Sequence, residues 1–189
     1  LTGFEQRGGG TDDHADGWGI AFYEGKGCRL FLDPIAAAHS PVAEFVRHYP
    51  IRSLNVVAHI RKATRGPVGL ENTHPFQREL WGRYWVFAHN GTLDNYRPPA
   101  GHQYRPVGTT DSEAAFCELL ETLCRRFASG APHPAALTAE IATWAARLAD
   151  HGTFNFLLCT GERLFAHCAT SLVYIERRAP FSKARLLDS

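Results

Sequence analysis

The chain has 189 residues, of which 44% are hydrophobic and 21% charged, and its formal net charge at pH 7 is +1. This composition is that of an ordinary globular protein, and no apolar run approaches the roughly 18 residues that a membrane-spanning helix needs. Because the net charge is small and the arginines are scattered, we expect a single domain over residues 1–189 with neither nucleic acid nor a membrane as partner.

The first half of the chain is rich in predicted strands. Residues 18–23 and 28–32 are β-rich runs separated by EGKG, which predicts a hairpin. Residues 41–49 begin with a proline and place apolar side chains at helical spacing, which predicts a short helix. Residues 54–60 and 83–89 are dense in β-branched and aromatic residues without alternation, which predicts central strands covered on both faces.

Two helices and further strands are predicted in the second half. Thr110 and Glu113 form a capping-box pattern, after which apolar residues recur every three or four positions. Residues 134–150 repeat such a stripe and predict a second helix. Three β-rich segments with tight connections then predict strands at residues 153–159, 163–168 and 171–176.

Two polar stretches, residues 7–19 and 61–80, fit neither a helix nor a strand. Both are rich in glycine, charge and histidine, and polar loops at the ends of rigid strands commonly carry functional sites. Gly8 to Gly10 lack the Lys-Ser/Thr of a phosphate-binding loop, so we expect a tightly turned or mobile loop there. The sequence assigns no role to His14 or Asp16.

Several residues that follow predicted strands form a chemically coherent set. Arg61 and Thr64 follow one central strand, Asn90 and Gly91 follow the other, and Asp111 begins the first long helix. A guanidinium and a carboxylate in one pocket match the α-carboxylate and α-ammonium of an amino acid. An amide and a backbone N–H would remain to stabilise an oxyanion on its side chain.

Four ordered motifs carry a family resemblance: HIRKATRG (59–66), THPF (73–76), HNGTL (89–93) and TDSE (110–113). They resemble the class II glutamine amidotransferase domain of the N-terminal nucleophile (Ntn) hydrolases. RGGGTDDHADGWGIAFYEGKG and RRAPF further resemble its stand-alone bacterial branch of the YafJ type. The resemblance implies an α+β fold, a four-layer αββα sandwich of two mostly antiparallel sheets between helical layers.

The resemblance also implies the role of each site residue. Arg61, with Thr64 beside it, would hold the glutamine carboxylate, and Asp111 would hold its amine. Asn90 and Gly91 would form the oxyanion hole. The family's nucleophile is an N-terminal cysteine whose α-amine acts as base, whereas this sequence begins at Leu1. We therefore expect one strand with the cysteine before Leu1, and further strands after Ser189.

Simpler interpretations of the same residues remain open. Asn90-Gly91 is also the strongest short hairpin signal, and Asp111 could merely favour the helix N-terminus. Arg61 could form a surface ion pair with Glu71 or Glu79.

The histidines also allow a metal site. His59, His74 and His89 could bind a metal with help from His14 and Asp16, but they lack the spacing of paired metal ligands. We predict neither metal nor cofactor and give these three histidines a supporting role. Imidazoles of His59 and His89 bonded to the backbone would brace the strand ends.

The predicted reaction is hydrolysis of a γ-glutamyl amide, with L-glutamine as the default substrate and a separate protein as a potential ammonia acceptor. One alternative is an amidohydrolase for a larger γ-glutamyl compound of thiol metabolism, and another is a non-catalytic glutamine-binding regulatory subunit. The five cysteines are odd in number and contain no Cys-x-x-Cys pair, which favours a reducing, cytoplasmic location.

Overall fold

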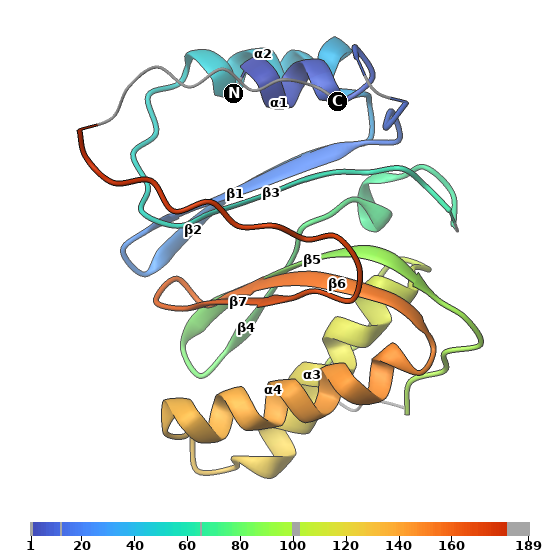
Figure 1. Ribbon diagram of the computed structural model, residues 1–189, viewed down its shortest axis with the longest axis vertical. Helices are drawn as coiled ribbons and strands as arrows, with labels where there is room; N and C mark the ends of the chain where they lie inside the picture. The colour runs from blue at the N-terminus through green and yellow to red at the C-terminus, as the bar shows by residue number, and fades with distance from the viewer. Residues whose placement is uncertain (1, 12, 65, 100–102, 181–189) are drawn as a thin grey trace.

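The computed structural model describes residues 2–11, 13–64, 66–99 and 103–180. Figure 1 shows two sheets packed face to face, with helices covering the outer face of each. Helices α1 (Thr2–Arg7) and α2 (Pro41–His48) cover one sheet, and α3 (Asp111–Arg126) and α4 (Pro134–Ala149) cover the other. The predicted αββα sandwich is therefore confirmed.

The strand pairs of the described residues are all antiparallel. The first sheet has the order β2-β1-β3 and consists of β1 (Trp18–Glu24), β2 (Gly27–Asp33) and β3 (Val56–Ile60). The second has the order β4-β5-β6-β7 and consists of β4 (Phe76–Leu80), β5 (Arg83–Leu93), β6 (Gly152–Cys159) and β7 (Leu164–His167). Two short 3-10 helices, η1 (Ala37–His39) and η2 (Leu70–Asn72), lie in the connections.

Each interface between layers has its own apolar cluster. Trp18 and Ile20 of β1 pack toward the α1/α2 layer, whereas Ala21 and Tyr23 of the same strand belong to the cluster between the two sheets. The third and largest cluster joins the second sheet to α3 and α4. Because the central strands are covered on both faces, their sequences lack the alternation of a half-exposed strand.

Three details differ from the predictions. In the described part of the first sheet β3 is an edge strand, because β1 occupies the centre. Residues 61–80 contain the unpredicted strand β4, whose buried Phe76 and Leu80 flank a polar middle. Residues 171–176 were predicted as a strand but pair with no strand among the described residues.

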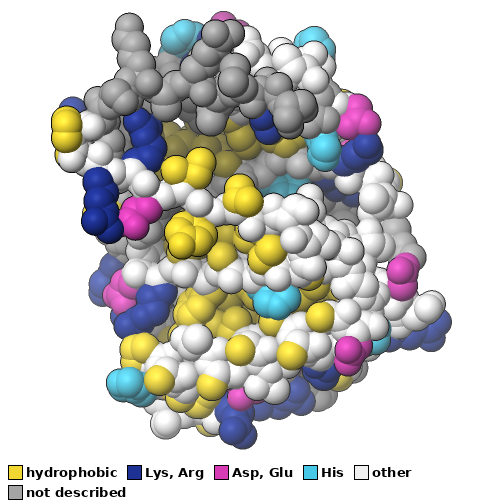
Figure 2. Space-filling view, in the orientation of Figure 1, with side chains coloured by type: hydrophobic (Ala, Val, Ile, Leu, Met, Phe, Trp, Pro, Cys, Tyr) yellow, Lys and Arg dark blue, Asp and Glu magenta, His cyan; other side chains and the backbone are white. Residues whose placement is uncertain are grey.

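The segment around residues 171–176 is extended and rich in exposed hydrophobic side chains. Val173, Tyr174 and Ile175 are largely exposed. Figure 2 shows hydrophobic side chains gathered across the middle of this face, where Figure 1 shows the segment crossing in front of the sheets. In the described residues, no helix is both long and apolar enough to cross a bilayer.

Candidate active site

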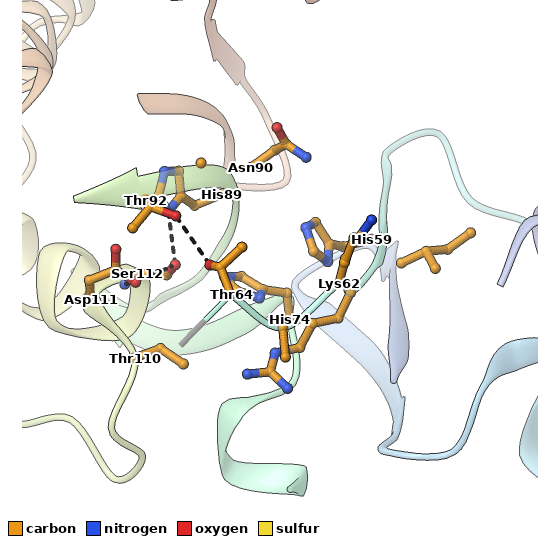
Figure 3. Close-up of a pocket in the computed structure, with 14 residues that line it drawn as sticks. His59, Lys62, Thr64, His74, His89, Asn90, Thr92, Thr110, Asp111 and Ser112 are labelled. Atoms are coloured by element: carbon orange, nitrogen blue, oxygen red, sulfur yellow. Dashed lines mark hydrogen bonds between the residues drawn. The ribbon is translucent and has the colours of Figure 1, made fainter. Parts of the chain in front are cut away.

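One small pocket lies where the end of β3, the second half of β5 and the start of α3 meet (Figure 3). Its volume is about 200 Å³, below the roughly 300–1,000 Å³ of sites for drug-sized ligands, so it suits a smaller molecule. All eight residues predicted from the sequence line it: His59, Arg61, Thr64, His74, His89, Asn90, Gly91 and Asp111. The structure therefore brings together residues at the ends of three elements and His74 from the connection before β4.

Arg61 follows β3 directly and is only 4% exposed. Its backbone N–H donates to the Gly17 carbonyl oxygen at 2.8 Å. Burial lowers the pKa of the guanidinium, and the negative charges of Asp16 and Glu71 partly offset this. The group remains a cation at neutral pH.

Asp16 explains how the loop after β3 keeps its shape. Its carboxylate accepts a hydrogen bond from the Ala63 backbone N–H at 2.7 Å, and its own N–H donates to the Arg61 carbonyl at 3.1 Å. This role of Asp16 could not be predicted from the sequence, because the contact joins residues 47 positions apart. Asp16 therefore positions Arg61 from outside the pocket.

Asn90 and Gly91 do not form a hairpin bend. They continue β5, where Asn90 pairs with Asn155 and Gly91 with Phe154 of β6. The Asn90 residue is exposed, and its carbonyl accepts a hydrogen bond from the Asn155 side chain at 3.3 Å. The expectation of a turn was wrong, because the long partner strand β6 keeps the chain extended through Leu93.

Gly91 is required by close packing against β6. Its φ of 147° lies in the region that favours glycine, and an added Cβ would lie 1.8 Å from the Thr153 carbonyl oxygen. Real Cβ atoms do not approach another atom so closely. The backbone at Gly91 therefore lies against the partner strand with no room for a side chain.

Asp111 lines the pocket at the first residue of α3. Its Oδ2 accepts a hydrogen bond from the Leu93 N–H at 2.6 Å, and its Oδ1 accepts one from the Ser112 N–H at 2.9 Å. We expected this carboxylate to be free for a ligand. It instead also links α3 to the end of β5. A carboxylate has about four acceptor positions, so it retains capacity for an ammonium group.

The capping pattern at α3 is only partly as predicted. The Thr110 hydroxyl accepts from the Glu113 N–H at 3.2 Å and so caps the helix. The buried Glu113 carboxylate accepts from the Val107 and Gly108 N–H groups at 3.1 and 2.7 Å, and also pairs with Arg78. Glu113 therefore fixes the loop before the helix.

The three histidines differ in their hydrogen bonds. His89 Nε2 lies 3.2 Å from the Thr153 carbonyl and Nδ1 lies 2.8 Å from the Ser112 hydroxyl. Since a carbonyl only accepts, Nε2 carries the proton and the neutral ring accepts the Ser112 hydroxyl hydrogen. His89 thus links β5 to the β6 backbone and to the start of α3.

His59 and His74 lie against each other, with ring centroids 4.5 Å apart. Both ring nitrogens of His74, and Nδ1 of His59, are buried without a hydrogen-bond partner among the described residues. Burial lowers the pKa of His59 to about 4 and holds that of His74 well below its usual value. Both rings are therefore neutral at pH 7.

The buried histidines predict that acid destabilises the fold. As the pH falls, the unfolded chain, with ordinary histidine pKa values near 6.5, takes up protons before the folded chain does. The contribution of these histidines to the free energy of unfolding is therefore fully present above pH 6.5. It should fall on acidification toward pH 4 by up to about 1.4 kcal/mol per pH unit for each such histidine. Urea unfolding at pH 7, 6 and 5 measures this slope. His74→Leu should make the slope shallower and the exposed His39→Gln should not, whereas an unchanged slope in His74→Leu would contradict the explanation.

Three further polar residues of the pocket were not singled out from the sequence: Lys62, Thr92 and Ser112. Each lies within two positions of a predicted residue, so the motifs contain them without marking them. Thr92 Oγ1 lies 3.1 Å from Thr64 Oγ1 and links β5 to the loop after β3, and the Lys62 ammonium pairs with Asp13 at 2.6 Å. Figure 3 shows Thr110 and Asp111 on one side of the pocket, His59 and Lys62 on the other, and Thr64 and His74 between them.

The glycine-rich loop and the metal hypothesis can also be placed. Gly8 to Gly10 turn tightly against α1 and η1 and do not line the pocket. Within residues 2–11, 13–64, 66–99 and 103–180, no group of three or more His, Cys, Asp or Glu side chains is arranged to hold a metal ion.

Comparisons with known proteins agree with the resemblance in the motifs. Residues 1–189 match the family of class II glutamine amidotransferases. The chain is 56% identical over 188 residues to YafJ of Escherichia coli, a proposed glutamine amidotransferase, and the match covers 100% of this chain and 74% of YafJ. A crystal structure of a predicted glutamine amidotransferase from Pseudomonas aeruginosa is 50% identical, with a TM-score of 0.79 over 97% of this chain and 72% of the other.

A shorter match is to a protein whose name specifies a hydrolase. Over 94 residues the chain is 33% identical to the γ-glutamyl-hercynylcysteine sulfoxide hydrolase of Mycobacterium tuberculosis, covering 47% of this chain and 36% of that protein. The family itself rests on the match over the whole chain and on the identity to YafJ. The chain therefore belongs to the class II glutamine amidotransferases, together with bacterial proteins of the YafJ type.

Proposed function

We propose that this chain binds L-glutamine or another γ-glutamyl amide and stabilises the transition state of its hydrolysis. The observation that carries the proposal is the convergence of Arg61, Asp111 and the Asn90-Gly91 pair on one cavity of about 200 Å³. A cation and an anion held in one small cavity match the charged groups of a single amino acid.

Each group has a distinct role in the proposed reaction. Arg61, with Thr64 beside it, holds the α-carboxylate, and the remaining acceptor positions of Asp111 hold the α-ammonium. The Asn90 side-chain amide and the Gly91 backbone N–H donate to the oxyanion that develops on the side-chain carbonyl. His59, His74 and His89 support the strand ends as neutral rings.

The nucleophile in this proposal is an N-terminal cysteine that precedes Leu1. The five cysteines of residues 1–189 all lie in the described regions, and none lines the pocket. Burial raises the pKa of Cys28 and Cys117 to about 11, which keeps these thiols protonated at neutral pH. The N-terminal thiol would transfer its proton to the α-amine, attack the carbonyl and expel ammonia, and water would then release glutamate from the thioester.

A larger γ-glutamyl substrate is the second candidate. It is favoured by the partial similarity to the hydrolase from Mycobacterium tuberculosis, whose name specifies a γ-glutamyl thiol derivative. Turnover of glutamine, glutathione and simple γ-glutamyl amides separates the two, because a glutaminase should prefer the smallest substrate. Glutaminase activity would release ammonia, either to a separate acceptor protein or to solvent.

The codons before Leu1 distinguish catalysis from binding alone. A cysteine directly after the initiator methionine supports the enzyme, and its absence leaves a non-catalytic glutamine-binding subunit. We keep the cytoplasm as the predicted location.

Glutamine affinity tests the proposed role of Arg61. Arg61→Ala should weaken binding of L-glutamine by about 10- to 100-fold, because a hydrogen bond to a charged group contributes roughly 1.5–3 kcal/mol. Isothermal titration calorimetry measures the dissociation constant. Arg52→Ala removes an exposed guanidinium outside the pocket and should leave the affinity unchanged. Unchanged affinity in Arg61→Ala, or no binding by the parent chain, would overturn the proposal.

A further inference from the structure

Asn72 is completely buried just outside the pocket and joins two loops. Its Nδ2 donates to the Pro67 carbonyl oxygen at 3.1 Å, and its Oδ1 accepts from the Thr109 N–H at 2.8 Å. A longer contact of 3.5 Å links Nδ2 to the Thr109 hydroxyl. The amide thus uses its donor on one loop and its acceptor on another that is 37 residues away in sequence.

These two loops are the ones that present the charged groups of the pocket. Pro67 belongs to the connection that follows Arg61 and Thr64. Thr109 leads directly into the helix cap and Asp111. Any shift of one loop against the other would therefore change the separation of the guanidinium and the carboxylate.

The two loops pack so closely at Gly108 that no side chain fits between them. A Cβ added at Gly108 would lie 2.3 Å from Asn72 Oδ1 and 2.6 Å from the Glu71 carbonyl oxygen. The backbone of the second loop therefore rests directly on the Asn72 amide, without an intervening side chain. The size and hydrogen bonds of Asn72 set the distance between the loops at this point.

Two carboxylates also hold the segment before α3 and the start of this helix, but in the described part of the chain neither bonds to the loop that follows Arg61. Glu113 accepts from the Val107 and Gly108 N–H groups, and Asp111 accepts from the Leu93 N–H of β5. Of the hydrogen bonds described above, those of Asn72 connect this segment to the loop that follows Arg61. Asn90 and Gly91 lie on β5 and do not depend on it.

We propose that Asn72 is a positioning residue that fixes the spacing between Arg61 and Asp111 and so selects ligands with an α-amino acid head group. The inference rests on the proposed function. The carboxylate and ammonium of an amino acid are attached to one carbon, so the clamp accepts only a narrow range of spacings. Loss of Asn72 should therefore weaken recognition of the head group and spare recognition of the amide end.

Calorimetric titration with two ligands tests this inference. L-glutamine carries both charged groups, whereas glutaramate has the same carbon chain and terminal amide but lacks the α-ammonium. Asn72→Ala and Asn72→Ser, which both remove the amide without adding a charge, should weaken glutamine binding by about tenfold or more, the equivalent of one hydrogen bond to a charged group. Glutaramate binding should change by less than about threefold, so the preference for glutamine falls.

Thr73→Val is the matched control, because it breaks a buried hydrogen bond of the same connection without touching the bridge. Its hydroxyl donates to the Gly69 carbonyl at 2.9 Å, within one loop. Thr73→Val should leave the preference for glutamine over glutaramate intact. Thermal melts confirm that each variant is folded. Equal weakening of both ligands in the folded Asn72 variants would mean a merely structural role and would overturn the inference.

Asp111→Asn separates failure of the inference from failure of the proposed function. If Asp111→Asn abolishes the preference for glutamine and the Asn72 variants keep it, only the positioning role is wrong. If Asp111→Asn also keeps the preference, the proposed amino-acid clamp itself is wrong.

Discussion

Asn90→Ala should lower kcat for glutamine hydrolysis by about 10²–10³, the usual effect of removing one oxyanion-hole donor. The glutamine dissociation constant should change little, because the charged groups proposed to bind glutamine belong to Arg61 and Asp111 and not to β5. Asn90 has an exposed side chain on a strand that β6 holds in place through continuous pairing. Its truncation should therefore remove a donor without disturbing the strand.

Turnover of the natural gene product, together with calorimetric affinity, separates the two effects. Gln77→Ala is the matched control, because it removes an amide side chain from the neighbouring strand β4, outside the pocket. It should leave both constants unchanged. Equal turnover in Asn90→Ala and the parent would remove Asn90 from the oxyanion hole.

The sequence predicted those parts of the fold that depend on local pattern or on burial. The apolar stripes of α3 and α4 have a helical period, so their positions follow from the sequence alone. The apolar run of residues 83–89 indicated a strand covered on both faces, and β5 confirms it, because its side chains belong to the cluster between the sheets on one face and to the α3/α4 cluster on the other. Residues of all four motifs line the pocket, and three of the motifs lie at the end of a predicted strand or at the start of a predicted helix.

What the sequence could not predict depends on distant partners. Asn90-Gly91 has the local chemistry of a turn, and only pairing with β6, more than sixty residues later, keeps it extended. β4 went unrecognised because its middle residues are polar. Asp111 was expected to be free for a ligand and Glu113 to cap its own helix, yet both carboxylates accept hydrogen bonds from backbone N–H groups outside α3. Long-range contacts decide each of these cases.

Gly91→Ala should lower the free energy of unfolding by about 2–6 kcal/mol, more than a surface substitution does, and should abolish glutamine turnover. Two physical terms add: a φ of 147°, which costs a residue with a side chain roughly 1–3 kcal/mol, and a steric overlap that costs at least as much. The overlap involves backbone, because the new Cβ would lie 1.8 Å from the Thr153 carbonyl oxygen. Either β5 or β6 must move, and the movement displaces the donors next to it.

Gly82→Ala separates the overlap from the backbone conformation. Gly82 also has a positive φ, 72°, but an added Cβ there would meet nothing within 4 Å. Gly82→Ala should lower the free energy of unfolding only by the conformational term, about 1–2 kcal/mol. Urea unfolding of both variants measures the two losses. A larger loss in Gly91→Ala than in Gly82→Ala assigns the difference to the contact with β6. Equal losses would show that β6 yields to the methyl group, and Gly91 would then be needed for its conformation and not for its close approach.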